Sequence, residues 1–150
     1  MVENKICENS DAFFLGYTSQ EGNQRCLDCN AAAPQWASVT YGILICMNCA
    51  GVHRKFGASI SQVRSINLDL WTEKHIQMMK VGGNLHFKEF LEKYNLENEE
   101  ARVKYQSKAA LFYRRKIAML CSNQEMNEED IDYDEGRQLI DGAIIPTKSP

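Results

Sequence analysis

Membrane-spanning, secretory and lipid-anchor signals are missing from the 150-residue sequence. It has no run of about 18 apolar residues, so we expect no membrane-spanning helix. The opening residues, MVENKICENS, lack the basic and apolar regions of a secretory signal peptide. Val2 stands where N-myristoylation requires glycine, and the C-terminal KSP is not a prenylation motif. These absences predict a cytoplasmic protein in a reducing compartment.

Motifs of the common hydrolases are also missing. The sequence contains no GxxxxGK[ST] phosphate loop, no GxSxG nucleophile motif and no HExxH metalloprotease motif. Asp and Glu are absent from residues 30 to 68. We therefore expect no carboxylate in the region of the clustered cysteines described below, and no general acid–base catalysis there.

Charge is unevenly distributed, although the net charge is only -3. Residues 101 to 120 hold six basic residues and no acid, whereas residues 125 to 141 hold eight acids and one arginine. Such segregation indicates a face for an acidic partner and a solvated acidic tail. For the basic block alone, an ordinary solvated helix face is an equally good interpretation.

Four of the six cysteines form two C-x2-C pairs separated by sixteen residues: Cys26, Cys29, Cys46 and Cys49. In a reducing compartment this spacing favours a zinc site over disulfides. Four thiolates fill the tetrahedral coordination of Zn²⁺, so the metal is predicted to be structural and to activate no water. The alternative is two redox-active or core cysteine pairs.

The remaining cysteines and the histidine that follows the second pair have simpler interpretations. Cys7 and Cys121 have no partner motif and are predicted to be buried thiols. His53 follows Cys49 by four positions, but the predicted tetrahedron is already full. We therefore interpret His53 as a packing or hydrogen-bonding residue rather than a metal ligand.

The hydrophobic pattern predicts an α+β domain over residues 7 to 121, with a short antiparallel sheet surrounded by helices. Strands over 36–41 and 43–46 form a hairpin that carries the second cysteine pair back over the first, and a third strand is expected within 63–68. A short helix follows Cys49 and ends at Gly57. Helices are also expected after four predicted N-caps, which are Asn9 or Ser10, Thr72, Asn84 and Ser107. Residues 122 to 150 are predicted to be an acidic, flexible tail.

The sequence segments around the cysteines resemble those of the GTPase-activating proteins for Arf-type small GTPases, most of all those of the Golgi-associated branch. That family carries C-x2-C, sixteen or seventeen residues, then C-x2-C-x4-R, and here Arg54 stands at the arginine. PQWASVTYGILIC and CAGVHR are similar to family segments, as are ISQVRSINLDLW, MKVGGNLHFKEFL and KYQSKAALFYRRKIAML. The resemblance covers about residues 7 to 120.

This resemblance implies a structural Zn²⁺ and a catalytic arginine finger, Arg54, inserted beside the GTP of a partner GTPase. Trp36 and Ile45 match positions that support the arginine and the binding surface, and Lys55 and His53 are assigned to the same partner-binding or supporting group. The implied partner is a GTP-bound Arf-family GTPase, with peripheral association with Golgi or vesicle membranes through partners. The chain departs from the family pattern L-G-x-H-[IL]-S after the arginine, having Phe56 and Ser59 in place of the leucine and histidine.

Two other functions remain open from the sequence. A non-catalytic adaptor would bind the GTPase without accelerating hydrolysis. A nucleic-acid-binding zinc finger has similar cysteine spacing, but the acidic net charge and the lack of a basic arm beside the finger disfavour it.

Overall fold

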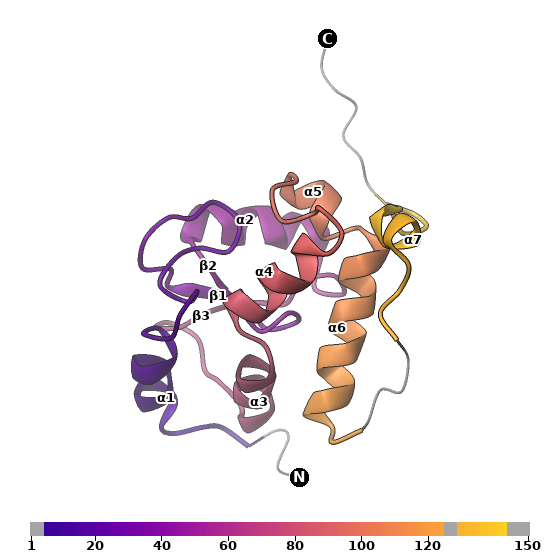
Figure 1. Cartoon of the computed structure of the whole chain (residues 1–150). Coiled ribbons are helices and arrows are strands. Elements are labelled where there is room, and N and C mark those ends of the chain that lie inside the picture. The colour runs from indigo at the N-terminus through magenta and orange to yellow at the C-terminus, as the bar shows by residue number, and fades with distance from the viewer. Residues whose placement is uncertain (1–4, 125–128, 144–150) are drawn as a thin grey trace.

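The computed structural model describes residues 5–124 and 129–143. It confirms the predicted fold class: a three-stranded antiparallel sheet surrounded by helices, with the four cysteines clustered beside it (Figure 1). In this part of the chain, none of the helices has both the length and the apolar character required to cross a membrane.

The sheet is built on the predicted hairpin. Strands β1 (Trp36–Ser38) and β2 (Ile43–Ile45) pair in antiparallel register, and β3 (Val63–Ser65) pairs with the other edge of β1, giving the order β2-β1-β3. Gly42 in the hairpin turn has φ +64°, and a Cβ there would lie 2.6 Å from the carbonyl oxygen of Met78. Glycine is therefore required both by the backbone conformation and by the close approach of the helix that contains Met78.

Helices surround this sheet. Their bounds are α1 (Ser10–Tyr17), α2 (Met47–Phe56), α3 (Glu73–Val81), α4 (Asn84–Glu92), α5 (Ala101–Lys104), α6 (Lys108–Cys121) and α7 (Tyr133–Arg137). Helix α2 packs against β1 and β3, α4 packs against β2 and α6, and α3 packs against α6. The short helices α5 and α7 were not predicted.

Two of the four predicted N-caps are confirmed, and those of α4 and α1 are not. At α1, Ser10 is the first helical residue and Asn9 stands at the N-cap position without a side-chain cap hydrogen bond. The side chains of Thr72 and Ser107 accept hydrogen bonds from the first turns of α3 and α6. Asn84 is instead the first residue of α4 and is buried, with its side chain turned toward β2. Its Oδ1 accepts the amide of Leu44 at 2.7 Å and its Nδ2 donates to the Leu44 carbonyl at 3.0 Å. Satisfying a buried edge of the sheet takes precedence over capping the helix.

The core consists mainly of large aromatic side chains between the sheet and the helices. Tyr41, Phe87, Tyr105 and Tyr113 are each at most 1% exposed, and their rings contact one another at centroid distances between 4.5 and 6.1 Å. Aromatic contacts of this kind stabilise a fold beyond the apolar area that they bury. They fix the position of the segment that leads from α5 into α6.

Part of the predicted acidic tail lies against the domain. Helix α7 packs on α6 (Figure 1), the Tyr94 hydroxyl donates to the carbonyl of Ile131 at 2.7 Å, and Arg137 donates to the carbonyl of Tyr94. The amide of Ile140 bonds to the carbonyl of Gln106 at 2.8 Å. Residues 125–128 and 144–150 of the predicted tail lie outside the described residues.

Candidate functional site

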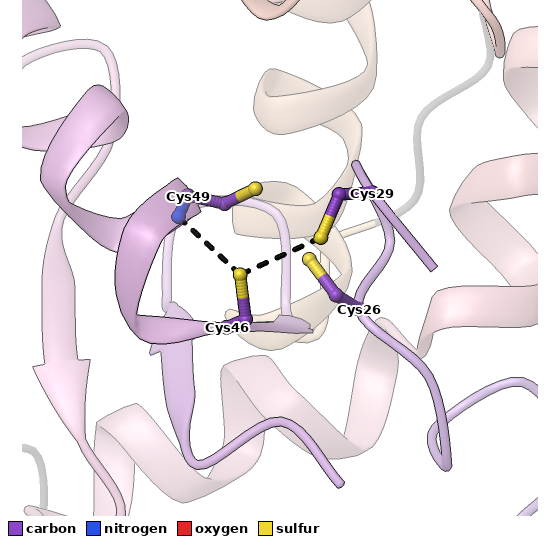
Figure 2. A group of neighbouring side chains, drawn as sticks. All are labelled: Cys26, Cys29, Cys46 and Cys49. Atoms are coloured by element: carbon purple, nitrogen blue, oxygen red, sulfur yellow. Dashed lines mark hydrogen bonds between the residues drawn. The ribbon is translucent and has the colours of Figure 1, made fainter. Parts of the chain in front are cut away.

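The four predicted metal ligands converge on one point. Their Sγ atoms all lie within 4.8 Å of one another, and Figure 2 shows the sulfur atoms of the two pairs facing each other. The sulfurs of Cys29 and Cys46 are 3.5 Å apart. A tetrahedral Zn²⁺ with bonds of about 2.3 Å needs sulfurs roughly 3.8 Å apart, so the donor set fits such an ion. The arrangement supports a four-thiolate metal site and disfavours two independent cysteine pairs.

Local structure explains why each pair turns its sulfurs inward. After Cys26 the chain folds back on itself, with the amide of Asn30 bonded to the carbonyl of Cys26 and Asn30 at φ +65°. Cys46 is the N-cap of α2, and its Sγ accepts the amide of Cys49 at 3.4 Å (Figure 2). The second pair is therefore part of the first turn of α2, so a metal held there fixes the start of this helix.

A carboxylate lies inside the first cysteine pair, and the sequence-based expectation of an acid-free site is wrong. Asp28 has a 7% exposed side chain and accepts hydrogen bonds from His53 at 2.8 Å, Lys104 at 3.1 Å and Tyr105 at 2.6 Å. Burial raises the pKa of Asp28, but the bond from His53 and the charge of Lys104 outweigh it and hold that pKa below its usual value. Asp28 is thus an ionised structural link rather than a catalytic acid.

The interpretation of His53 as a hydrogen-bonding residue is confirmed. Its side chain is fully buried, with Nε2 on Asp28 and Nδ1 2.7 Å from the Ser61 hydroxyl. The Ser61 hydroxyl also contacts Ser38 of β1 at 2.6 Å. His53 therefore connects the first cysteine pair, helix α2 and the sheet through one polar chain.

Arg54, the residue after His53 on α2, is exposed and lies over Trp36. The Cζ atom of Arg54 is 4.8 Å from the centre of the Trp36 ring, within range of a cation–π interaction. Gly57, at φ +88°, ends the helix and donates its amide to the carbonyl of Arg54. The guanidinium therefore projects from a capped helix end onto an aromatic platform.

The other predicted site residues fall into two groups. Ile45 is fully buried and pairs with Trp36 across the sheet, so it can support this platform but cannot contact a partner. Lys55 is exposed and lines a cavity of about 700 Å³ between α2 and residues 98–102. In the loop that departs from the family pattern, Phe56 contacts the ring of His53 at 5.8 Å, whereas Ser59 is exposed.

Several supporting residues were missed from the sequence. Lys104 and Tyr105 are separated from Asp28 by more than seventy positions, and no local motif links them. Asp28 could have been noticed because it lies between two metal ligands. Cys7 and Cys121, predicted to be buried, are half-buried.

Comparison with known proteins agrees with this arrangement. Residues 12–127 match a family model described as "Putative GTPase activating protein for Arf". ADP-ribosylation factor GTPase-activating protein 3 from Macaca fascicularis is 36% identical over 129 residues, which make up 85% of this chain and 24% of that protein. ADP-ribosylation factor GTPase-activating protein GCS1 from Saccharomyces cerevisiae is 37% identical over 130 residues, 85% of this chain and 37% of that protein. The chain thus spans between about a quarter and somewhat over a third of the length of these relatives.

Solved structures show the same fold. A crystal structure from Cryptosporidium parvum, of a protein described as a putative GTPase activating protein for ADP ribosylation factor, superposes with a TM-score of 0.71 at 28% identity, over 75% of this chain and 90% of that one. The ArfGap domain of HIV-1 Rev binding protein superposes with a TM-score of 0.54 at 19% identity, over 89% of each chain, and shows the fold alone.

Proposed function

Because the chain belongs to the Arf GTPase-activating protein family, we propose that it stimulates GTP hydrolysis by a GTP-bound Arf-type small GTPase. Arg54 enters the nucleotide site of the GTPase in trans, while the GTPase supplies GTP and Mg²⁺. Phosphoryl transfer depends chiefly on positioning and on stabilising charge, and an arginine supplied in this way contributes roughly 10³ to 10⁵ in rate. The chain is then an activator and not itself a hydrolase.

The observation that carries this proposal is the setting of Arg54. The residue is exposed, lies over Trp36 at 4.8 Å and belongs to the last turn of a helix whose first turn holds two of the clustered cysteines. A planar guanidinium can bind phosphate oxygens through two parallel hydrogen bonds. Holding it on a fixed helix removes much of the entropy that a free arginine would lose on entering the nucleotide site.

We assign the metal as one structural Zn²⁺ bound by Cys26, Cys29, Cys46 and Cys49. Four thiolates suit Zn²⁺ and leave no open coordination position for a water. The ion would fasten α2 to the loop of the first cysteine pair, and Asp28 adds a second link through His53. The metal's contribution is therefore to place Arg54, and it takes no part in the chemistry.

The remaining site residues act around the arginine. Trp36 orients the guanidinium, Ile45 and His53 support it from the interior, and exposed Lys55 contacts the GTPase. We further propose that the protein is cytoplasmic and reaches Golgi or vesicle membranes peripherally, through its partners.

Single-turnover hydrolysis of GTP bound to an Arf-family GTPase tests this function. The zinc-loaded chain should accelerate hydrolysis, and Arg54→Lys should lose nearly all of that acceleration because it keeps the charge but loses the two-pronged donor. Arg115→Lys is the matched control, since Arg115 is exposed on α6 and lies outside the site; it should accelerate hydrolysis like the unmodified chain.

Three results would contradict the proposal. Full acceleration by Arg54→Lys would show that Arg54 is not an arginine finger. Binding of the GTPase without any acceleration would identify an adaptor. Salt-dependent binding to duplex DNA, without GTPase binding, would identify a nucleic-acid-binding finger.

A further inference from the structure

A second concentration of positive charge lies away from the cysteines, in a groove between α3, α6 and the end of the sheet. We call it the basic groove; it has a volume of about 450 Å³, and its polar lining consists of Thr40, Gln62, Lys74, His75, Arg114, Arg115 and Ser122. None of the described residues that line it is acidic. Helices α3 and α6 lie side by side in this region (Figure 1).

The basic groove is separate from the Arg54 site. It opens next to Val39 and Gln62, which continue β1 and β3 beyond the Ser38–Val63 pair, whereas Trp36 lies at the opposite end of the same strand. Trp36 and Val39 are three residues apart, or about 10 Å along an extended strand. The two sites therefore use opposite ends of the sheet.

The three cations of the basic groove have no carboxylate partner among the described residues. Within residues 5–124 and 129–143, Lys74, Arg114 and Arg115 form no ion pair, although both arginines lie on the same helix as Lys116. Lys93, Lys104 and Lys116 each lie within 4 Å of an aspartate oxygen. Positive charge gathered in a concave site without internal compensation attracts an anion.

The groove is also held in shape by polar contacts that leave donors available. Arg114 is half-buried and donates to the hydroxyl of Tyr41 at 3.1 Å, which orients its guanidinium through one of its five N–H groups. Thr40 Oγ1 accepts the amide of Gln62 at 2.9 Å, so its own hydrogen remains available to donate. His75, in the wall of the groove, is affected by its surroundings. Burial lowers its pKa to about 4, and the charges of Arg64 and Lys74 contribute to this shift. His75 is therefore neutral at physiological pH, and the charge of the groove comes from Lys74 and the two arginines.

We propose that the basic groove binds an anion carrying two or more phosphate groups, as in a phosphorylated inositol. The volume lies within the range of small-ligand sites, about 300 to 1,000 Å³. Arg114 and Arg115 lie on α6 and Lys74 lies on α3. Each guanidinium can bind two oxygens of one phosphate, so this set of cations suits several phosphates on a ring better than it suits a single small anion. Such a group can come from a soluble inositol phosphate or from the headgroup of a membrane lipid. The site is independent of the proposed GTPase activation.

Isothermal titration of the zinc-loaded chain with inositol trisphosphate tests the site. The chain should bind, and the double variant Lys74→Glu with Arg115→Glu should bind at least about tenfold more weakly, since each charge-assisted hydrogen bond to a phosphate is lost. Both side chains are exposed, so circular dichroism should show an unchanged fold. Lys88→Glu, an exposed cation of α4 outside the groove, is the matched control and should bind normally.

Four results would overturn the proposal. They are no binding by the unmodified chain, unchanged binding by the double variant, an equal loss in Lys88→Glu, and equally tight binding of a hexaglutamate peptide. The last would show an unspecific polyanion surface.

Flotation with phosphatidylcholine vesicles, with and without phosphatidylinositol bisphosphate, identifies the source of the phosphates. Binding that needs the phosphorylated lipid and is displaced by inositol trisphosphate identifies a membrane headgroup. Binding of the soluble compound without vesicle binding identifies a soluble ligand. Vesicle binding that inositol trisphosphate does not displace, or that the double variant retains, would place the contact elsewhere and overturn the proposal.

Discussion

Arg54 and the basic groove lie at opposite ends of the same three-stranded sheet, and their side chains are held by different means. Arg54 depends on polar links: a cysteine cluster at the start of its helix and the buried Asp28–His53 contact. The groove depends mainly on two helices that pack through core contacts, with local hydrogen bonds from Arg114 to Tyr41 and from Gln62 to Thr40. A single guanidinium that must reach a reacting phosphate needs a fixed base, whereas several cations around a bound anion can adjust to it.

The largest effect is expected from removing one metal ligand. Cys46→Ser should lose bound zinc and cooperative folding, because a structural zinc site contributes on the order of 10 kcal/mol to folding of small zinc domains. Metal analysis and thermal unfolding measure both properties. Cys7→Ser, which changes a half-buried cysteine outside the cluster, should retain the metal and the transition. A folded, zinc-free Cys46→Ser protein would show that the metal is not structural.

The next largest effect separates the two sites. Arg54→Lys should lower GTPase stimulation by about 10³-fold or more and leave binding of inositol trisphosphate unchanged. The double variant Lys74→Glu with Arg115→Glu should lose binding of inositol trisphosphate and keep full GTPase stimulation when hydrolysis is measured in solution without membranes. If either variant impairs both assays equally, the two ends of the sheet do not act independently.

A smaller effect is expected from breaking the link between Asp28 and α5. Lys104→Met should destabilise the zinc-loaded chain by about 3 kcal/mol, since a buried carboxylate loses its cation. Urea denaturation gives the free energy of unfolding. The matched control is Lys93→Met, which breaks an exposed pair with Asp130 and should cost less than about 1 kcal/mol. An equal loss of unfolding free energy in the two variants would show that the buried pair stabilises the chain no more than the exposed pair.

The smallest effect concerns the aromatic platform beneath the arginine. Trp36→Leu should reduce GTPase stimulation by only about fivefold, because an exposed cation–π contact contributes roughly 1 kcal/mol. Trp36→Phe keeps an aromatic face and should lose less. If Phe and Leu give the same rate as the unmodified chain in single-turnover assays, Trp36 does not position Arg54.

The sequence determined the features whose causes are local. Two C-x2-C pairs predict a metal cluster because one turn of chain suffices to aim two thiolates at one ion, and the structure brings the four sulfurs together. The hairpin, the capped starts of α3 and α6 and the end of α2 at Gly57 likewise follow from residues within a few positions of one another. Arg54 was assigned its role through the resemblance to the family motif, in which the arginine follows the last cysteine by five positions.

Only the tertiary structure decided which distant groups meet. The expectation of an acid-free site failed because Asp28, between Cys26 and Cys29, lies just outside the acid-free range of residues 30 to 68. Its partners Lys104 and Tyr105 lie 76 and 77 positions away, and only the packed chain brings them to this carboxylate. Asn84 does not cap α4, because its side-chain amide bonds the backbone of Leu44 on a buried strand. The basic groove arises in the same way, since charges on α3 and α6 become neighbours only when those helices pack. Local spacing shows which face of a helix or strand is buried, but it does not show which distant element packs against that face, and long-range polar contacts depend on that packing.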